Sequence, residues 1–207
     1  IVTWICSAPT SGDAAPPPMT APNAPSPSTP ASLPVHLTGF IGRGRELSDV
    51  TSLIQSVRLL TLTGAGGSGK TRLAAEAAAR ATSFSRLAWV DLASLGDGGL
   101  VAQQIATTLQ APERAGASPQ RALIDAIGDD CLLLVLDNCE HVVRDCAELV
   151  DALLRGCPNL TVLATSREAL GVPGETAWLV PPMEQDEAVR LFVERDQSAL
   201  PSFVLTD

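Results

Sequence analysis

From about residue 44 onward, short apolar runs alternate with amphipathic segments. Apolar residues at helical spacing predict helices around residues 47–54, 73–81, 98–109, 118–127, 142–154 and 184–195. Apolar runs bounded by turn residues predict strands at residues 58–63, 87–91, 131–137, 160–165 and 176–180. Strands and helices in alternation predict an α/β fold, a mostly parallel five-stranded sheet with helices on both faces.

Two local signals sharpen this pattern. Residues 131–137 form a continuous apolar run that ends in an acid, which is typical of a strand buried on both faces. Ser118 followed by Pro119 supplies an N-cap and a first helical residue for the helix around 118–127. Residues 1–34 look different, because they hold nine of the 16 prolines and Asp13 is the only charged residue before Arg43. We predict a disordered or polyproline-like segment over residues 1–36.

Composition excludes several classes of protein. The formal net charge is −9, and aromatic residues make up only 3% with no tyrosine, which argues against direct nucleic-acid binding by this segment. No run of about 18 apolar residues exists, so we expect no membrane-spanning helix. The five cysteines include no C-x-x-C pair, which favours reduced thiols in a cytoplasmic protein over a zinc site at Cys139 and His141. The apolar start lacks the basic residues of a signal peptide, and a chain that begins at Ile1 suggests a fragment.

The candidate chemistry begins with a glycine-rich loop. Residues 64–71 read Gly-Ala-Gly-Gly-Ser-Gly-Lys-Thr and match the phosphate-binding pattern G-x-x-x-x-G-K-[ST] between a predicted strand and a predicted helix. Gly64, Gly66, Gly67 and Gly69 leave the backbone N–H groups open to phosphate oxygens. Lys70 would place its ammonium on the β and γ phosphates, and Thr71 would offer a hydroxyl to Mg²⁺. We therefore predict a P-loop that binds a nucleotide.

A second reading of the same glycines stays open. Gly64, Gly66 and Gly69 also spell G-x-G-x-x-G, and Asp91 ends the next predicted strand at the distance that a dinucleotide fingerprint requires. The Lys-Thr pair directly after the last glycine is required by a P-loop and not by that fingerprint, so the dinucleotide reading is weakened.

Acidic and basic residues follow the later strands. Asp137 ends the most apolar strand, where a carboxylate can hold Mg²⁺ through water; capping of the next helix is the alternative. In many P-loop ATPases an acid directly follows the metal-binding Asp and acts as the base for hydrolysis, but here that residue is Asn138, which cannot take a proton. Glu140 is the nearest acid. It either acts as the base or starts the next helix, where a negative charge is favourable. Arg167 ends the strand at 160–165 and could contact a γ-phosphate, or it could be a surface arginine. Slow hydrolysis, or binding without turnover, follows as a prediction.

Four motifs in order resemble the nucleotide-binding module of bacterial signal-transduction ATPases, the NB-ARC-like or STAND regulators, and especially those of LuxR-type transcriptional regulators. They are Phe-Ile-Gly-Arg at 40–43 with Arg-Glu-Leu at 45–47, the run at 60–71, Leu-Val-Leu-Asp-Asn-Cys-Glu-His at 134–141, and Thr-Ser-Arg-Glu-Ala-Leu at 165–170. The resemblance covers residues 34–207. It implies a P-loop NTPase three-layer sandwich whose first strand is central. It also implies nucleotide binding by Arg43 and by the loop with its flanks, Gly64, Ala65, Gly66, Gly67, Ser68, Gly69, Lys70, Thr71 and Arg72.

The resemblance also assigns roles outside the loop. Asp137 would be the Walker B acid, Arg167 the γ-phosphate sensor, and residues 181–183 the linker to a helical subdomain. The expected organisation is therefore a linker at 1–36, a P-loop nucleotide-binding domain at 37–183, and the start of a truncated helical subdomain at 184–207. In the family, ADP holds a closed state and ATP favours an open, self-associating one, which would involve the full-length protein.

Three functions remain in competition. The first is an ATP/ADP regulatory switch with Mg²⁺, a possible slow ATPase within a cytoplasmic transcriptional regulator. The second is a metabolic P-loop enzyme, either a small-molecule kinase or a transport ATPase. Residues 92–130 hold only Arg114 and Arg121 as candidate lid arginines, and no Leu-Ser-Gly-Gly-Gln-like signature is present. The third is a nucleotide-independent scaffold with a vestigial P-loop. The sequence does not indicate which residues would form a pocket for adenine.

Overall fold

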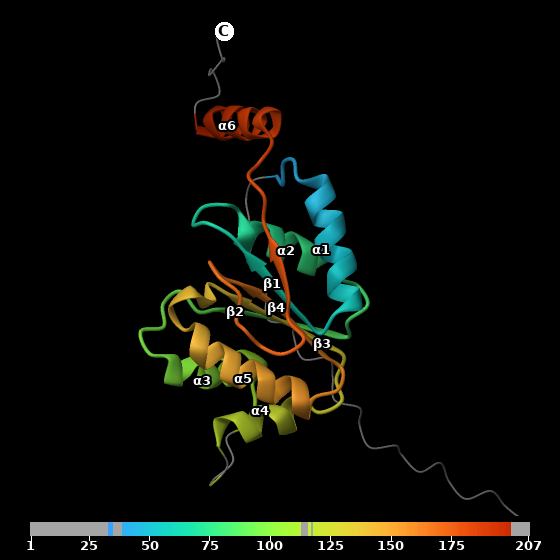
Figure 1. The fold of residues 1–207 in the computed structure, drawn as a ribbon, viewed down its shortest axis with the longest axis vertical. Coiled ribbons are helices and arrows are strands. Elements are labelled where there is room, and N and C mark those ends of the chain that lie inside the picture. The colour runs from blue at the N-terminus through green and yellow to red at the C-terminus, as the bar shows by residue number, and fades with distance from the viewer. Residues whose placement is uncertain (1–32, 35–38, 113–115, 117, 200–207) are drawn as a thin grey trace, which may run out of the picture.

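One all-parallel five-stranded sheet organises the chain in the computed structural model, which describes residues 33–34, 39–112, 116 and 118–199 (Figure 1). The strands are β1 (Leu59–Thr63), β2 (Arg86–Asp91), β3 (Leu132–Asp137), β4 (Leu160–Thr165) and β5 (Thr176–Leu179). Their order is β2-β3-β4-β1-β5, with every neighbouring pair parallel. The predicted α/β class with a parallel sheet is confirmed. The expectation that β1 is central is wrong, because β4 occupies the middle of this order and β1 lies between β4 and β5.

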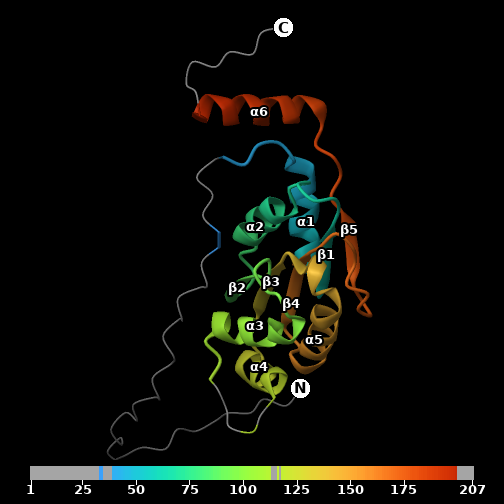
Figure 2. The same ribbon diagram turned by 90° about the vertical axis from the view of Figure 1, so that its left-hand side faces the viewer.

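Helices cover both faces of the sheet and form a three-layer sandwich (Figure 2). On one face lie α1 (Gly44–Ser56) and α2 (Lys70–Arg80). On the other lie α3 (Val101–Leu109), α4 (Pro119–Ile127) and α5 (Val143–Gly156), with α4 packed against α3 and α5. Short 3₁₀ turns precede α3 and α5, namely η1 (Gly98–Leu100) and η2 (Cys139–His141). The last described helix, α6 (Gln185–Ala199), lies beyond the N-terminal ends of α1 and α2.

Strand alternation decides which residues face which helices. All six residues of β3 are buried, as expected for an inner strand of a parallel sheet. Leu132, Leu134 and Leu136 join the core beneath α3, α4 and α5. Leu133 and Val135 join the core beneath α1 and α2. Because side chains alternate along a strand, Asp137 falls on the α2 side at the end of β3.

The helix boundaries follow the local signals in the sequence. Ser118 caps α4 by accepting a hydrogen bond from Arg121 N at 3.3 Å, and Pro119 is the first helical residue, as predicted. The helix predicted around 98–109 begins instead as the 3₁₀ turn η1. Asp97 caps that turn by accepting from Gly99 N at 2.9 Å, because an Asp side chain readily bonds to the backbone two residues ahead.

Several other expectations concern the surroundings of the sheet. Cys139, Cys146 and Cys157 are buried free thiols and Cys131 is an exposed one; Cys6 lies outside the described residues. The predicted segment 1–36 also lies outside them except for Leu33 and Pro34, and Leu33 is partly buried against the α1/α2 core. None of the helices described is both long enough and apolar enough to cross a membrane.

Candidate functional site

The glycine-rich loop connects the carboxyl end of β1 to the N-terminus of α2. Gly67 and Gly69 have φ angles of 76° and 87°, in the left-handed region that glycine enters without strain. Ser68 N donates to Ala65 O at 3.2 Å and closes the loop on itself. The loop leads directly into the N-terminus of α2 at Lys70, where the backbone N–H groups of the first helical turn and the helix dipole favour an anion.

Lys70 is the first residue of α2 and its side chain folds back over the loop. The residue is 7% exposed, and its Nζ donates to Gly64 O at 2.8 Å and to Ala65 O at 2.9 Å. Within the described part of the chain, both of these partners are neutral carbonyls, so the buried positive charge lacks a counter-charge. A phosphate at the loop would supply one.

Asp137, Asn138 and two threonines form a hydrogen-bonded group at the strand ends, which we call the strand-end cluster (Thr71, Asp137, Asn138 and Thr165). Thr71 Oγ1 and Thr165 Oγ1 both donate to Asp137 Oδ1, at 2.9 and 2.6 Å. Asn138 Nδ2 donates to Asp137 Oδ2 at 3.3 Å, and Asn138 N donates to Thr165 Oγ1 at 3.0 Å. The carboxylate of Asp137 therefore faces the P-loop helix and caps neither η2 nor α5.

Sheet geometry explains why these residues meet. Thr165 ends β4 on the same face as Leu163, which packs in the α1/α2 core as Leu133 and Val135 of β3 do. Asp91 ends β2 in register with Asp137 of β3, and registered residues of parallel strands share a face. Asp91 Oδ1 accepts a hydrogen bond from Ala93 N at 2.9 Å. The α2 face therefore carries two carboxylates at this edge of the sheet.

The electrostatic environment of Asp137 favours a cation. Burial raises the pKa of this carboxyl above its usual value, and the hydrogen bonds from Thr165 and Thr71 lower it in part. The nearby charges of Asp91 and Glu140 raise the pKa of Asp137 further. A divalent cation would offset this concentration of negative charge.

Glu140 and Arg167 form an ion pair beside the loop. Arg167 Nε lies 3.4 Å from Glu140 Oε1, and the Arg167 side chain is 68% exposed while that of Glu140 is 23% exposed. Glu140 Oε2 is buried and has no hydrogen-bond partner among the described residues. A Cβ placed on Gly66 would lie 3.9 Å from Arg167 Nη2, so the guanidinium also reaches the loop.

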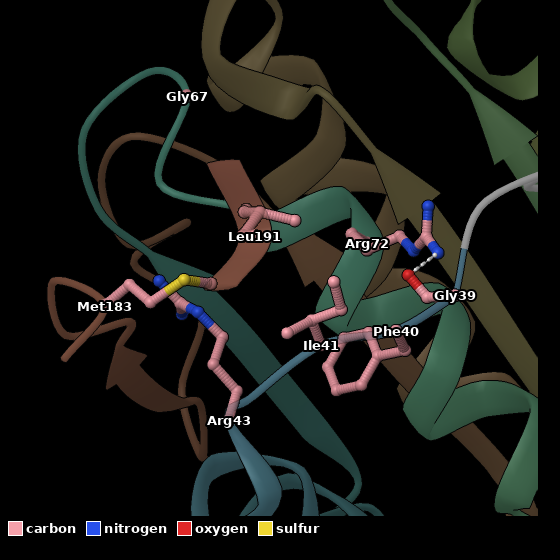
Figure 3. A pocket seen from close by; sticks show the side chains of 9 residues that line it. Gly39, Phe40, Ile41, Arg43, Gly67, Arg72, Met183 and Leu191 are labelled. Carbon is pink, nitrogen blue, oxygen red and sulfur yellow. Dashed lines mark hydrogen bonds between the residues drawn. The ribbon is translucent and has the colours of Figure 1, made fainter. Parts of the chain in front are cut away.

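On the other side of the loop lies a pocket that the sequence did not reveal, which we call the helix-side pocket. Two adjoining hollows of about 180 and 490 Å³ share five lining residues, namely Arg43, Gly67, Gly69, Met183 and Leu191. Figure 3 shows Arg43, Met183, Phe40 and Ile41 around the pocket, with Phe40 and Ile41 to the right of the Arg43 guanidinium. The larger hollow has the size of a small-molecule site.

Arg43 is the most unusual residue of the helix-side pocket. It is 4% exposed with φ at 57°, and its Nη2 donates to Pro181 O at 3.1 Å. Its Nε and Nη1 are buried without a partner in the residues that the structure describes. Glu187 of α6 accepts from Arg43 N with both carboxylate oxygens, at 3.1 and 3.0 Å. Such unpaired buried donors are costly unless a ligand or water satisfies them.

The structure brings most of the predicted residues to this one region. The loop residues, Lys70, Thr71 and Asp137 adjoin one another, while Glu140 with Arg167, and Arg43, flank the loop. Arg72 differs, because its Nη2 donates to Gly39 O at 2.9 Å and it lines the helix-side pocket (Figure 3). Thr165 and Glu187 were missed. Strand alternation could have indicated Thr165, whereas nothing in the sequence pairs Glu187 with a residue 144 positions away.

The residues present fit a magnesium nucleotide. The buried Ser68 Oγ has no partner among the described residues, and neither do the two Arg43 nitrogens, so unused hydrogen-bonding groups lie on both sides of the loop. The Thr71 hydroxyl and the Asp137 carboxylate supply the oxygen ligands that Mg²⁺ prefers. Among described residues, no group of three or more His, Cys, Asp or Glu side chains could hold a metal by itself.

This fold and loop define the class: the chain has the P-loop NTPase fold. It is similar to a STAND protein with a tetratricopeptide-repeat sensor from Pyrococcus horikoshii (TM-score 0.56, 20% identity, 86% of this chain and 28% of the other). It is also similar to Cdc6p from Pyrobaculum aerophilum (TM-score 0.58, 18% identity, 82% and 52%). A third similar structure is the Aeropyrum pernix ORC2 protein, in complexes with ADPNP and ADP (TM-score 0.56, 15% identity, 76% and 52%).

Relatives in sequence come from mycobacteria. An uncharacterized protein of Mycobacterium tuberculosis is 43% identical over 173 residues, which is 82% of this chain and 44% of that protein. A candidate HTH-type transcriptional regulator of the same organism is 45% identical over 157 residues, 75% of this chain and 18% of that regulator. The chain thus spans less than half the length of these relatives. No family model matches it.

Proposed function

We propose that this chain is the ATP/ADP-binding module of a bacterial signal-transduction ATPase, with residues 37–183 as the nucleotide-binding domain. The observation that carries the proposal is Lys70. Its buried ammonium bonds only to loop carbonyls in the described structure and lies one residue from Thr71, which bonds to Asp137. The ADPNP and ADP complexes of the structurally similar ORC2 protein support adenine nucleotides as ligands.

In this proposal each group of residues has one task. The loop N–H groups and Lys70 bind the phosphates, and Arg43 contributes its two unpaired nitrogens from the helix-side pocket. Thr71 and Asp137 would hold Mg²⁺, the carboxylate acting through water. When bound, Mg²⁺ neutralises part of the phosphate charge. Arg167 is the candidate sensor of the terminal phosphate.

The strand-end cluster supports slow hydrolysis or none. A general base must accept a proton from the attacking water. Asn138 cannot do so, and its side chain donates to Asp137. Glu140, the other candidate base, lies outside this cluster, in η2. We therefore expect turnover below about 1 per second, slower than the range typical of kinases.

A regulatory role is favoured over a metabolic one. The mycobacterial HTH-type relative is several times longer than this chain, as expected if the module is one part of a cytoplasmic transcriptional regulator. Residues 184–207 would begin a helical subdomain, and self-association in the ATP state would require the full-length protein. Arg121, one of the two candidate lid arginines, pairs with Asp125 at 3.0 Å on α4, away from the loop (Figure 2).

Nucleotide extraction from the purified chain tests the proposal. We expect ADP or ATP to be released from the denatured wild type and not from Lys70→Ala. Arg80→Ala is the matched control, since Arg80 lies on the same helix and pairs with Glu76 at its far end. Equal nucleotide content in wild type and Lys70→Ala would remove Lys70 from its proposed role. Release of phosphate at about 1–100 per second would contradict the slow-hydrolysis proposal.

A further inference from the structure

The ion pair between Glu140 and Arg167 is held by two rigid backbones. Arg167 follows β4, where Ser166 N donates to Leu62 O at 3.1 Å. The loop after it is closed by Glu175, whose carboxylate accepts from Leu170 N and Gly171 N at 2.8 and 2.7 Å. Glu140 lies in η2, immediately after β3. The two backbones are therefore anchored to neighbouring strands, so a change of pairing would be made by the side chains.

The two side chains differ in that freedom. Arg167 is 68% exposed, so its guanidinium can change rotamer at little cost. Glu140 is 23% exposed and one of its oxygens is buried, so its carboxylate has less room to change position than the guanidinium has. The guanidinium lies between two positions, Glu140 on one side and the loop at Gly66 on the other.

We propose that Glu140 competes with the terminal phosphate of a bound nucleoside triphosphate for Arg167, and that this competition sets the preference of the site for triphosphate over diphosphate. The inference rests on the proposed function, because it needs a nucleotide at the loop. A diphosphate leaves the Glu140–Arg167 pair intact. A triphosphate gains Arg167 only by breaking that pair, so part of the binding free energy of its third phosphate is lost. A ligand shifts such an equilibrium only by its differential interaction with the two arrangements.

A double-mutant cycle measures this competition. Affinities for Mg-ADP and for the magnesium complex of the β,γ-imido analogue of ATP are determined by calorimetry on the 207-residue chain. Glu140→Gln keeps the shape of the side chain and removes its charge. We expect it to raise the affinity for the analogue about two- to fivefold, the value of a partly exposed ion pair, with ADP affinity unchanged. Arg167→Ala should lower the affinity for the analogue and leave ADP affinity unchanged.

The decisive comparison is Glu140→Gln in the Arg167→Ala background. If Glu140 acts by holding Arg167, the substitution no longer changes the ratio of the two affinities there. If Glu140 only repels phosphate through its charge, the full effect persists without Arg167, which would overturn the proposal. Glu148→Gln is the matched control, because Glu148 pairs with Arg144 at 3.1 Å on the exposed surface of α5, and it should change neither affinity.

Other outcomes separate this inference from the proposed function. A wild type that binds neither nucleotide overturns both. If the wild type binds ADP and the analogue but Glu140→Gln lowers the affinity for the analogue, the inference alone is overturned. In that case Arg167 would contact phosphate and Glu140 together, and Glu140 would orient the guanidinium rather than compete for it.

Discussion

The strand-end cluster and the helix-side pocket both adjoin the glycine-rich loop, but they are built in different ways. The cluster is fixed by three neighbouring structural elements, with Thr71 on α2, Asp137 on β3 and Thr165 on β4 joined by bonds of 2.6 to 2.9 Å. The pocket depends on α6, whose Glu187 binds the backbone of Arg43 and whose Leu191 lines the wall. The strand-end cluster is therefore part of the sheet core, whereas the helix-side pocket depends on the position of α6.

This difference suggests that the strand-end cluster and the helix-side pocket have different functions. Groups anchored to the sheet keep their geometry whether or not a ligand is present, which suits phosphate and metal binding. A wall supplied by a separate helix can respond to the ligand, because its position depends on few contacts. We therefore expect substitutions in the cluster to change the response to magnesium, and substitutions in the pocket to change nucleotide affinity with or without magnesium.

Lys70→Ala should have the largest effect, because Lys70 carries the buried ammonium that would bind the phosphates in the loop between the two regions. Removal of one partner from a buried, charged hydrogen-bonded pair costs about 2–5 kcal/mol, which is at least about 30-fold in affinity. Calorimetry with ADP checks this, with Arg80→Ala as the control on the same helix. An affinity within a factor of three of the wild type would show that the loop does not bind phosphate through this side chain.

Asp137→Asn should come second, and its effect should depend on magnesium. Loss of a carboxylate that holds a metal through water typically costs about 10- to 100-fold in metal affinity. We expect ADP affinity with Mg²⁺ to fall toward the value measured in EDTA, while the value in EDTA changes little. If both values fell equally, Asp137 would hold the loop rather than the metal.

Thr165→Val should follow, as a test of positioning. Thr165 is 1% exposed and makes the shortest hydrogen bond to Asp137, so its loss leaves the carboxylate less constrained. A net loss of about 1 kcal/mol corresponds to roughly fivefold in the magnesium-dependent part of the affinity. Thr165→Ser, which keeps the hydroxyl, should restore it. Failure of serine to restore the affinity would point to packing instead.

Glu187→Gln tests the pocket and should have a smaller effect. It weakens the contact between α6 and Arg43, so ADP affinity should fall about two- to fivefold equally with Mg²⁺ and with EDTA. Asp186→Asn is the matched control, because it removes an exposed charge from the same turn of α6. An effect confined to magnesium conditions would contradict the separation of the strand-end cluster from the helix-side pocket.

The smallest predicted effect concerns the stability of the chain without nucleotide. The folded pKa of Asp137 is raised, mainly by burial, so its ionised form opposes folding at pH values above that pKa. Protonation relieves the cost as the pH falls toward the unfolded value of 3.8. Asp137→Asn should therefore raise the Tm at pH 7, and the difference should shrink toward pH 4. Each kcal/mol relieved corresponds to about 2–4 °C. A lower Tm for the variant at pH 7 would contradict this.

The same difference marks what the sequence could predict. The strands, the loop and Asp137 could be predicted from the sequence, because burial in a parallel sheet imposes long apolar runs and phosphate binding demands glycines at fixed spacing. Thr165 could also have been predicted, because the alternation of side chains along β4 places it on the face of the sheet that carries Asp137. The order of the strands was not, because β5 pairs outside β1 through contacts distant in sequence.

The helix-side pocket was beyond sequence reasoning for a physical reason. Its walls come from residues 39–43, the loop, Arg72 of α2 and residues 182–192, and no periodicity links segments so far apart. Phe40-Ile-Gly-Arg43 indicated a nucleotide contact only through a family resemblance. The left-handed turn at Gly42 and Arg43 and the Glu187 contact became visible only in three dimensions.

The claim that one loop, one ammonium and one carboxylate form a magnesium-nucleotide site is tested most directly by titration of the nucleotide-free wild type with ADP. With Mg²⁺ present, the result expected is binding of one nucleotide per chain, weakened by EDTA. Absence of binding by folded protein in the presence of Mg²⁺, for ADP and ATP alike, would contradict the claim.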